Sequence, residues 1–215
     1  LPARNGLVEK NVRPEYGELY RKLAAKKTHF PKPVTIEKKF TLENPEQQEV
    51  LILGSAGMRI VTAGDIVCYA GMSAGMNVSM KNDYNITVLR GQSVSEILIS
   101  PGKIGYAGSK TPTVVVALSE EGVQRRKKIF ATLPPSTFVL KEKSVPIPDT
   151  PAEVHEIDFR EYKVSKPDWA LASLGILAHK EKVMSRAMLD FALKSRFGEA
   201  LHLKALETIK KVVQD

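Results

Sequence analysis

The sequence predicts an α/β fold with an open, mostly parallel sheet flanked by helices. Residues 49–53 and 113–118 are short, near-continuous apolar runs, which is typical of strands that are buried on both faces. A break and then a helical pattern follow each run, and this alternation of strand, turn and helix is typical of parallel sheets. No internal repeat occurs at a fixed spacing, so a repeat architecture is not indicated.

The remaining elements follow from apolar spacing and from turn residues. Segments with strand character occupy residues 49–53, 76–80, 93–100, 113–118, 137–140 and 154–157. Segments with helical spacing occupy residues 58–74, 119–130, 169–178, 181–197 and 199–213. The polar residues 81–84 are expected to form a loop after the second strand, and Pro101 with Gly102 to turn the chain after the third.

The first 45 residues are set apart by charge. They carry ten Lys and Arg residues against five Asp and Glu, with prolines and no long apolar run. We expect a basic docking arm over residues 1–45, with a helix over 16–26 and a short strand over 34–42, and a compact domain over 46–215. A basic arm can bind nucleic acid, but its aromatic residues are too scattered to stack on bases. We therefore expect contact with an acidic partner or with solvent, and no nucleic acid.

Composition excludes several classes of protein. The chain has 215 residues, of which 43% are apolar, so it can bury a sizeable core. A single cysteine, Cys68, excludes internal disulfides, four-thiolate zinc sites and a self-contained iron–sulfur cluster, and it fits a reducing, cytoplasmic compartment. No segment has the length and apolarity of a membrane span or of an export signal. The net charge is +8.

The turn after the first apolar run is the clearest candidate binding site. Residues 54–57 (GSAG) lie between a strand and a helix N-terminus, where free N–H groups favour an anion. Arg59 in the first helical turn would add a positive charge. A plain tight turn with Arg59 in solvent explains the same residues equally well. A nicotinamide dinucleotide site is less favoured, because Ala56 and Arg59 replace fingerprint glycines and no acidic residue ends the second strand.

Other reactive residues have structural interpretations. Cys68 lies among apolar residues and is expected to be packed rather than reactive, and Trp169 is expected to anchor a helix in the core. The basic run at residues 125–128 is most simply a solvated helix end, although it could meet an acidic partner. No metal-ligand spacing links the four histidines, which are His29, His155, His179 and His202.

Four segments in order resemble the gamma subunit, or gamma domain, of the thiamine-diphosphate-dependent 2-oxoacid:acceptor oxidoreductases. They are residues 50–64 (VLILGSAGMRIVTAG), Tyr84 through Arg90-Gly91 into 93–100 (SVSEILIS), 112–121 (PTVVVALSEE) and 170–175 (ALASLG). The resemblance covers about 165 residues and leaves out the arm. The chain departs from the family pattern at Ala56, Met58 and Arg59 in the turn and at Gln92, where many members have a second glycine.

The resemblance implies a Rossmann-like gamma-type domain that is one subunit of an enzyme and is not catalytic alone. Members include the pyruvate, ketoisovalerate, indolepyruvate and phenylglyoxylate oxidoreductases of anaerobic metabolism. In them, partner subunits of the alpha, beta and delta types hold thiamine diphosphate, Mg²⁺ and [4Fe–4S] clusters, and ferredoxin or an NAD-reducing subunit accepts the electrons. The implied assembly is a cytoplasmic hetero-oligomer that oxidatively decarboxylates a 2-oxoacid.

The resemblance also implies site residues. Five would face the diphosphate of coenzyme A, with Thr62 supporting them: Gly54, Ser55, Gly57, Met58 and Arg59. Three would line the active-site cleft towards the partner's cofactor: Tyr84, Arg90 and Ser93. The alternative is a non-catalytic Rossmann-like nucleotide-binding or interaction module that assembles a larger complex.

Overall fold

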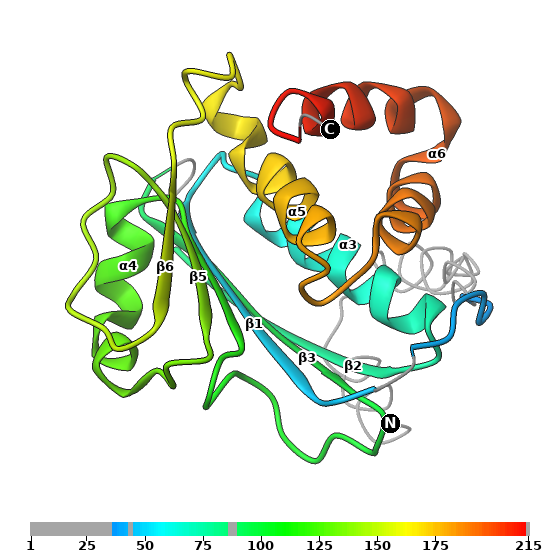
Figure 1. The fold of residues 1–215 in the computed structure, drawn as a ribbon, viewed down its shortest axis with the longest axis horizontal. Coiled ribbons are helices and arrows are strands. Elements are labelled where there is room, and N and C mark those ends of the chain that lie inside the picture. Colours follow the sequence, from blue (N-terminus) through cyan, green and yellow to red (C-terminus); the bar gives the residue numbers. More distant parts are fainter. Residues whose placement is uncertain (1–35, 43–44, 86–89, 214–215) are drawn as a thin grey trace, which may run out of the picture. The chain divides into compact units, whose positions relative to one another are not determined.

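A computed structural model describes residues 36–42, 45–85 and 90–213, and these residues form one sheet with helices on both faces (Figure 1). Across the sheet, the strands lie in the order β2 (Asn77–Tyr84), β3 (Gln92–Ser100), β1 (Gln48–Ser55), β4 (Val114–Ala117), β5 (Phe138–Glu142) and β6 (Glu153–Ile157). Strands β1, β4, β5 and β6 pair in parallel, whereas β3 runs antiparallel to both β1 and β2. The open, mostly parallel sheet is therefore confirmed.

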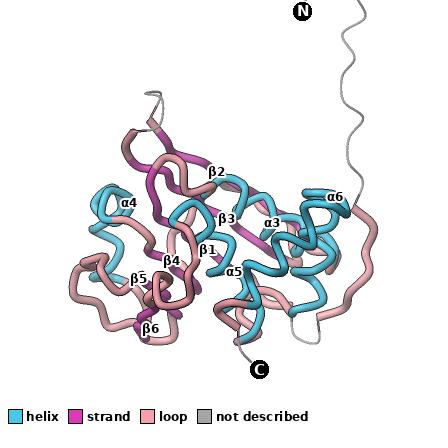
Figure 2. Tube along the Cα trace, turned by 90° about the horizontal axis from the view of Figure 1, so that it is seen from above, coloured by secondary structure: helices cyan, strands magenta, loops and turns pink. Residues whose placement is uncertain are grey.

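The helices divide unequally between the two faces. Helices α3 (Ile60–Ser73), α5 (Trp169–His179) and α6 (Arg186–Lys210) cover one face, and α4 (Glu120–Arg126) with the 3₁₀ turn η1 (Lys127–Thr132) covers the other. Figure 2 shows α4 on the opposite side of the strands from α3, α5 and α6. A further 3₁₀ turn, η2 (Lys166–Asp168), leads into α5.

Side chains of β1 alternate between two apolar cores. Val50 and Ile52 belong to the core beneath α3, α5 and α6, whereas Leu51 and Leu53 belong to the core beneath α4. Because side chains along a strand point alternately to opposite faces, a strand covered on both faces needs apolar residues at every position. This requirement explains the continuous apolar run in the sequence.

Small residues bring α3 close to the sheet. A Cβ atom on Gly64 would lie 2.4 Å from Ser95 Oγ, and one on Gly71 would lie 3.0 Å from a methyl carbon of Val78. The helix therefore approaches β2 and β3 more closely than side chains at these positions would permit. The small residues of this helix therefore permit its close packing on the sheet.

On the other face, α4 touches the backbone of β1. A Cβ atom on Gly122 would lie 2.5 Å from the amide nitrogen of Gly54 and 2.7 Å from the carbonyl carbon of Leu53. A Cβ atom on Gly54 would in turn lie 2.3 Å from the side chain of Ile60. Glycine at both positions lets α4 approach the carboxyl end of β1 from one face of the sheet and the start of α3 approach it from the other.

Residues 81–84 do not form the predicted loop. They continue β2, with Lys81 opposite Glu96 and Tyr84 opposite Ser93 on β3. Because β2 is an edge strand, its polar side chains can reach solvent while its backbone stays paired. Charged partners also stabilise this part of the strand, since Lys81 pairs with Glu96 and Asp83 with Arg125.

The basic run at residues 125–128 is only partly a solvated helix end. Arg125 Nε lies 2.6 Å from Asp83 Oδ2, and Arg126 Nη2 lies 2.9 Å from Glu96 Oε2. The acidic partners of these two arginines are therefore in the same chain, on β2 and β3. The helix containing the run ends earlier than predicted, at Arg126, and continues as the 3₁₀ turn η1.

Other element boundaries also differ from the sequence prediction. Helix α6 begins at Arg186 rather than at residue 181, because Glu181 and Val183 have φ angles of 52° and 70°, which an α-helix cannot contain. The predicted division into two last helices corresponds to a kink at Gly198, where φ is 70°. Residues 36–42 form no strand, and the other predictions for 1–35 lie outside the described residues.

A buried carboxylate fastens the long loop between β3 and β4. Glu49 is 5% exposed, and its Oε2 atom accepts hydrogen bonds from the backbone amides of Lys110 and Thr111, each at 2.7 Å, and from Ser109 Oγ at 2.9 Å. Burial alone would raise the pKa of Glu49, but these hydrogen bonds and one from Tyr106 lower it below its ordinary value. Folding therefore favours the ionised form.

Replacing Gly122 with alanine is expected to lower the free energy of unfolding by about 1–2 kcal/mol, because the added methyl group would meet backbone atoms that cannot rotate away. The helix-propensity gain of alanine, about 1 kcal/mol, offsets only part of this cost. Urea denaturation of the full chain measures the difference. Gly105→Ala is the control, since a Cβ atom there meets nothing within 4 Å. Equal stabilities for the two variants would contradict the close approach.

Glu49→Gln is expected to lower the free energy of unfolding by about 2 kcal/mol near neutral pH, because the amide group would face two backbone donors. The lowered pKa of Glu49 sets the pH dependence: the wild-type advantage is complete above the ordinary value of 4.5 and disappears as pH falls through the lower folded value. Denaturation curves of both proteins between neutral and acid pH test this. A gap that widened on acidification would contradict it.

Candidate functional site

The turn between β1 and α3 lies at the carboxyl end of β1, beside the other residues proposed from the resemblance. In the sheet register, Gly54 on β1 is opposite Ser93 on β3, and Ser93 is opposite Tyr84 on β2. The amide of Ala56 donates a 2.9 Å hydrogen bond to the carbonyl of Gly91. The fold therefore brings Tyr84, Ser93 and the turn together at the carboxyl end of β1. Arg90 precedes Gly91, whose carbonyl accepts the hydrogen bond from the turn.

Met58 fills the inside of this turn. Its side chain is 2% exposed, and its sulfur lies 3.4 Å from the amide nitrogen of Ser55 and 3.2 Å from Ser55 Oγ. The amide of Met58 in turn donates to the carbonyl of Ser55 at 3.2 Å. Three amides of the turn, those of Ser55, Ala56 and Met58, are therefore used within the chain. A ligand could still use the amides of Gly57 and Arg59 and those of the first turn of α3.

Arg59 precedes α3 rather than lying in its first turn. It is the N-cap residue, in the left-handed region with φ 55° and ψ 32°. Its side chain is exposed, and its Nη1 atom lies 2.6 Å from Asp168 Oδ1 at the end of η2. The charge therefore has a partner in the chain, which neither interpretation from the sequence included. An ion pair this exposed contributes at most about 1 kcal/mol, so a bound anion could compete for the guanidinium group.

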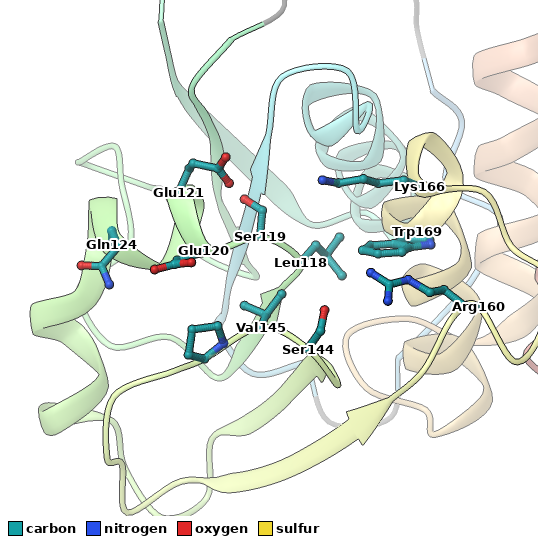
Figure 3. Close-up of a pocket in the computed structure, with 11 residues that line it drawn as sticks. Leu118, Ser119, Glu120, Glu121, Gln124, Ser144, Val145, Arg160, Lys166 and Trp169 are labelled. Atoms are coloured by element: carbon teal, nitrogen blue, oxygen red, sulfur yellow. The ribbon is translucent and has the colours of Figure 1, made fainter.

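A cavity of about 490 Å³ opens beside the turn, at the carboxyl ends of β4 and β5. The amide of Leu118, which lines it, bonds to the carbonyl of Leu53 on β1 at 2.7 Å. Figure 3 shows Lys166 and Arg160 on either side of Trp169, with Ser119 and Ser144 nearby. The other lining residues are Glu120, Glu121, Gln124, Val145 and Pro146.

The sequence analysis did not identify this cavity. Ligands of open α/β sheets bind outside the carboxyl ends of parallel strands, so the residues that follow 113–118 and 137–140 were candidates that the sequence could have offered. Arg160 and Lys166 had no such signal, because they come from the irregular segment before α5. Trp169 was correctly placed in the core: it is buried, and its indole N–H donates to the carbonyl of Val164 at 3.1 Å.

Both residues of the Arg59–Asp168 ion pair line a second hollow, of about 360 Å³. It contains Thr62 and Arg59 from the proposed coenzyme A residues, together with parts of α5 and α6. Its remaining lining residues are Leu171, Arg196, Phe197, Leu201, Lys204, Ala205 and Thr208. Arg59 is thus the residue of the turn that lines this hollow, whereas none of residues 54–59 lines the 490 Å³ cavity.

The described histidines have local partners. His155 Nε2 lies 2.7 Å from Glu153 Oε1, His202 Nε2 lies 2.7 Å from Asp190 Oδ1, and His179 contacts Arg186. Within residues 36–42, 45–85 and 90–213, no group of three or more His, Cys, Asp and Glu side chains could hold a metal ion. No helix in the same ranges is long and apolar enough to span a membrane. His29 lies outside the described residues.

The chain is therefore an α/β domain in which a short turn joins the first strand to a helix N-terminus. The sequence profile of the pyruvate ferredoxin/flavodoxin oxidoreductase family matches residues 49–215. The chain belongs to this family. No curated protein matches it in sequence.

Solved structures agree with this fold. A 2-oxoglutarate:ferredoxin oxidoreductase from Magnetococcus marinus, with 2-oxoglutarate, coenzyme A and succinyl-CoA bound, has a TM-score of 0.63 and 22% identity, over 79% of this chain and 31% of that one. The gamma subunit of a keto/oxoacid ferredoxin oxidoreductase from Geobacter sulfurreducens has a TM-score of 0.60 and 22% identity, over 77% and 98% of the two chains.

A third structure is a pyruvate oxidoreductase subunit from Thermotoga maritima, with a TM-score of 0.59 and 16% identity, over 78% of this chain and 93% of that one. The chain therefore spans about a third of the Magnetococcus protein but nearly the full length of the two separate subunits. At these identities the likeness concerns the fold.

Cys68 is expected to be inert in the folded protein. Burial, together with the negative charge of Asp65, raises the pKa of its thiol to about 12, so roughly one thiol in ten thousand is ionised near pH 8. Ellman's reagent should therefore detect no reactive thiol in the native chain within minutes. In concentrated guanidinium chloride it should detect one thiol per chain. Rapid reaction of the native protein would contradict the buried position.

Proposed function

We propose that this chain is the gamma-type subunit of a multi-subunit 2-oxoacid:ferredoxin oxidoreductase and that it contributes a coenzyme A-binding turn and part of the active-site wall. Family membership and the near-complete overlap with two separate subunits support the subunit assignment. The position of the turn carries the assignment of its role: residues 54–59 connect the carboxyl end of β1 to α3, and Arg59 lines the 360 Å³ hollow together with Arg196 and Lys204.

Coenzyme A fits the donors that remain in the turn. Gly57 is exposed, its φ is 86°, and a Cβ atom there meets nothing within 4 Å, so a phosphate group can approach its backbone. Arg59 and the amino end of α3 add positive charge on the same side. Gly54 and Met58 would act through the shape of the turn, because both are buried, while Ser55 and Thr62 would support it.

The active-site wall is assigned to Tyr84, Arg90 and Ser93. Tyr84 and Arg90 are exposed at the end of β2 and just before β3, whereas Ser93 is 8% exposed. In the complete enzyme, thiamine diphosphate would supply the decarboxylation chemistry from a partner subunit. The exposed tyrosine and arginine of this chain would bind and orient the 2-oxoacid, and the wall would exclude water from the cleft.

The remaining cofactors are assigned to partner subunits. A [4Fe–4S] cluster takes four thiolates, and this sequence has one cysteine. The proposal therefore assigns thiamine diphosphate, Mg²⁺ and [4Fe–4S] clusters to alpha, beta and delta-type subunits, and electron transfer to ferredoxin or an NAD-reducing subunit. It places the assembly in the cytoplasm, where a free thiol such as Cys68 stays reduced.

A second candidate is an interaction module that kept the fold without ligand binding. The observation in its favour is that three amides of the turn are already used, by the sulfur of Met58 and the carbonyls of Gly91 and Ser55, and that Asp168 pairs with Arg59. Under this alternative the turn is only a structural connection. Coenzyme A binding separates the two candidates, because the module would show none.

Arg59→Glu is expected to weaken binding of coenzyme A to the full chain about tenfold, or about 1.4 kcal/mol, because it reverses a charge at the amino end of α3. Isothermal titration calorimetry measures the affinity. Lys103→Glu, on the exposed loop after β3, controls for the change in net charge and should bind as the wild type does. An unchanged titration of the Arg59 variant would contradict the assignment of the turn.

Asp168→Asn separates contact with the ligand from support of the turn. Removing the carboxylate frees the guanidinium of Arg59, so coenzyme A is expected to bind at least as tightly as to the wild type. The same calorimetric titration tests this. A loss as large as that of Arg59→Glu would show that the ion pair holds the turn in shape and that Arg59 does not contact the phosphate groups.

A further inference from the structure

Helix α6 is bent at Gly198, and its second half is held in place. At the bend φ is 70° and ψ is 176°, and Figure 1 shows the two halves, orange and red, running in different directions. Two polar contacts span the bend: His202 Nε2 lies 2.7 Å from Asp190 Oδ1, and Lys194 pairs with Glu199. Farther along, a Cβ atom on Gly175 of α5 would lie 2.4 Å from Ile209, so the end of α6 packs closely on α5.

The bend leaves an open groove, which is the 360 Å³ hollow described above. Its apolar lining residues are Leu171, Phe197, Leu201 and Ala205. Leu201 is 57% exposed although it lines the groove. Apolar surface left in water costs about 25 cal/mol per Å², so covering this leucine would stabilise a complex.

Basic side chains outnumber carboxylates along the groove. Arg59, Arg196 and Lys204 line it, with Asp168 as the only carboxylate among the lining residues. Asp168 pairs with Arg59, and Asp65 pairs with Arg196 at 3.0 Å. Lys204 forms no ion pair within the described part of the chain. The charge that a ligand can neutralise is therefore chiefly that of Lys204, which favours a ligand with a negative group beside an apolar one.

We propose that the groove docks an acidic segment of another subunit of the complex, with an apolar side chain seated against Leu201 and carboxylates facing Lys204 and Arg196. The inference rests on the proposed function, because it requires partner subunits. Residues 1–35 of this chain are a poor match, since they carry eight Lys and Arg residues against three Glu. Charge complementarity therefore favours an acidic segment from outside the chain.

The test compares two equally exposed leucines on one helix. Leu201 lines the groove, whereas Leu203, which is 63% exposed, does not. Each is replaced by glutamate in the full chain, and the affinity for the remaining subunits, identified by co-purification with the wild-type chain, is measured by biolayer interferometry. Leu201→Glu is expected to weaken binding at least tenfold, and Leu203→Glu less than twofold. Both variants should unfold at the wild-type temperature, since both side chains are exposed.

A second pair of variants tests the charge of the partner segment. Lys204→Glu is expected to weaken binding at least tenfold, whereas Lys210→Glu, which lies outside the groove on the same helix, should change it less than twofold. Wild-type affinities for Leu201→Glu and Lys204→Glu would overturn the docking proposal. Normal assembly combined with a loss of coenzyme A affinity would also overturn it and would make the groove a ligand site. A wild-type chain that binds no other subunit would overturn the proposed function itself.

Discussion

The contact between Gly122 and Gly54 is the constraint on which the candidate site depends. With no side chain on either residue, α4 packs directly on the carboxyl end of β1, and the turn to α3 starts from a fixed point. Ser119 caps α4 through its hydroxyl group, which accepts the amide of Gly122 at 3.2 Å, and it also lines the 490 Å³ cavity. The same packing therefore positions both the turn and one wall of the cavity.

The turn itself differs from a fully open phosphate-binding loop. The sulfur of Met58 occupies its interior and contacts the amide and hydroxyl of Ser55, so fewer backbone donors point outward. The charge of Arg59 and the amino end of α3 then carry more of any interaction with an anion. The ion pair with Asp168 keeps that arginine beside the turn at little energetic cost, because the pair is exposed and a ligand can displace it.

The sequence predicted the parts of the fold that depend on continuous burial. The strands with apolar residues at every position and α3 with its small residues were found, because burial on two sides leaves a clear pattern. Residues 81–84 were misassigned because an edge strand can be polar, and the bases and acids that pair across β2, β3 and α4 are far apart in sequence. The N-cap position of Arg59 and the non-helical conformation of residues 181–185 depend on positive φ angles. Neither composition nor apolar spacing indicates such angles.

The candidate site was predicted only in part. Glycines and position after a strand indicated the turn, and the sheet register then brought it next to Ser93 and Tyr84. The cavity beside it combines side chains from three segments, and the Arg59–Asp168 pair joins residues 109 positions apart. Pairings of this kind arise from the topology of the fold, so a single sequence gives no local sign of them.

Under the proposed function, this chain works only within a larger oxidoreductase. Anaerobic purification of the native chain tests this dependence, with mass spectrometry of the proteins that accompany it and assays for thiamine diphosphate and iron. The expected result is a stable assembly that contains a thiamine diphosphate-binding subunit and an iron–sulfur subunit. A chain that elutes alone, without either cofactor, would contradict the enzymatic role and leave only the fold.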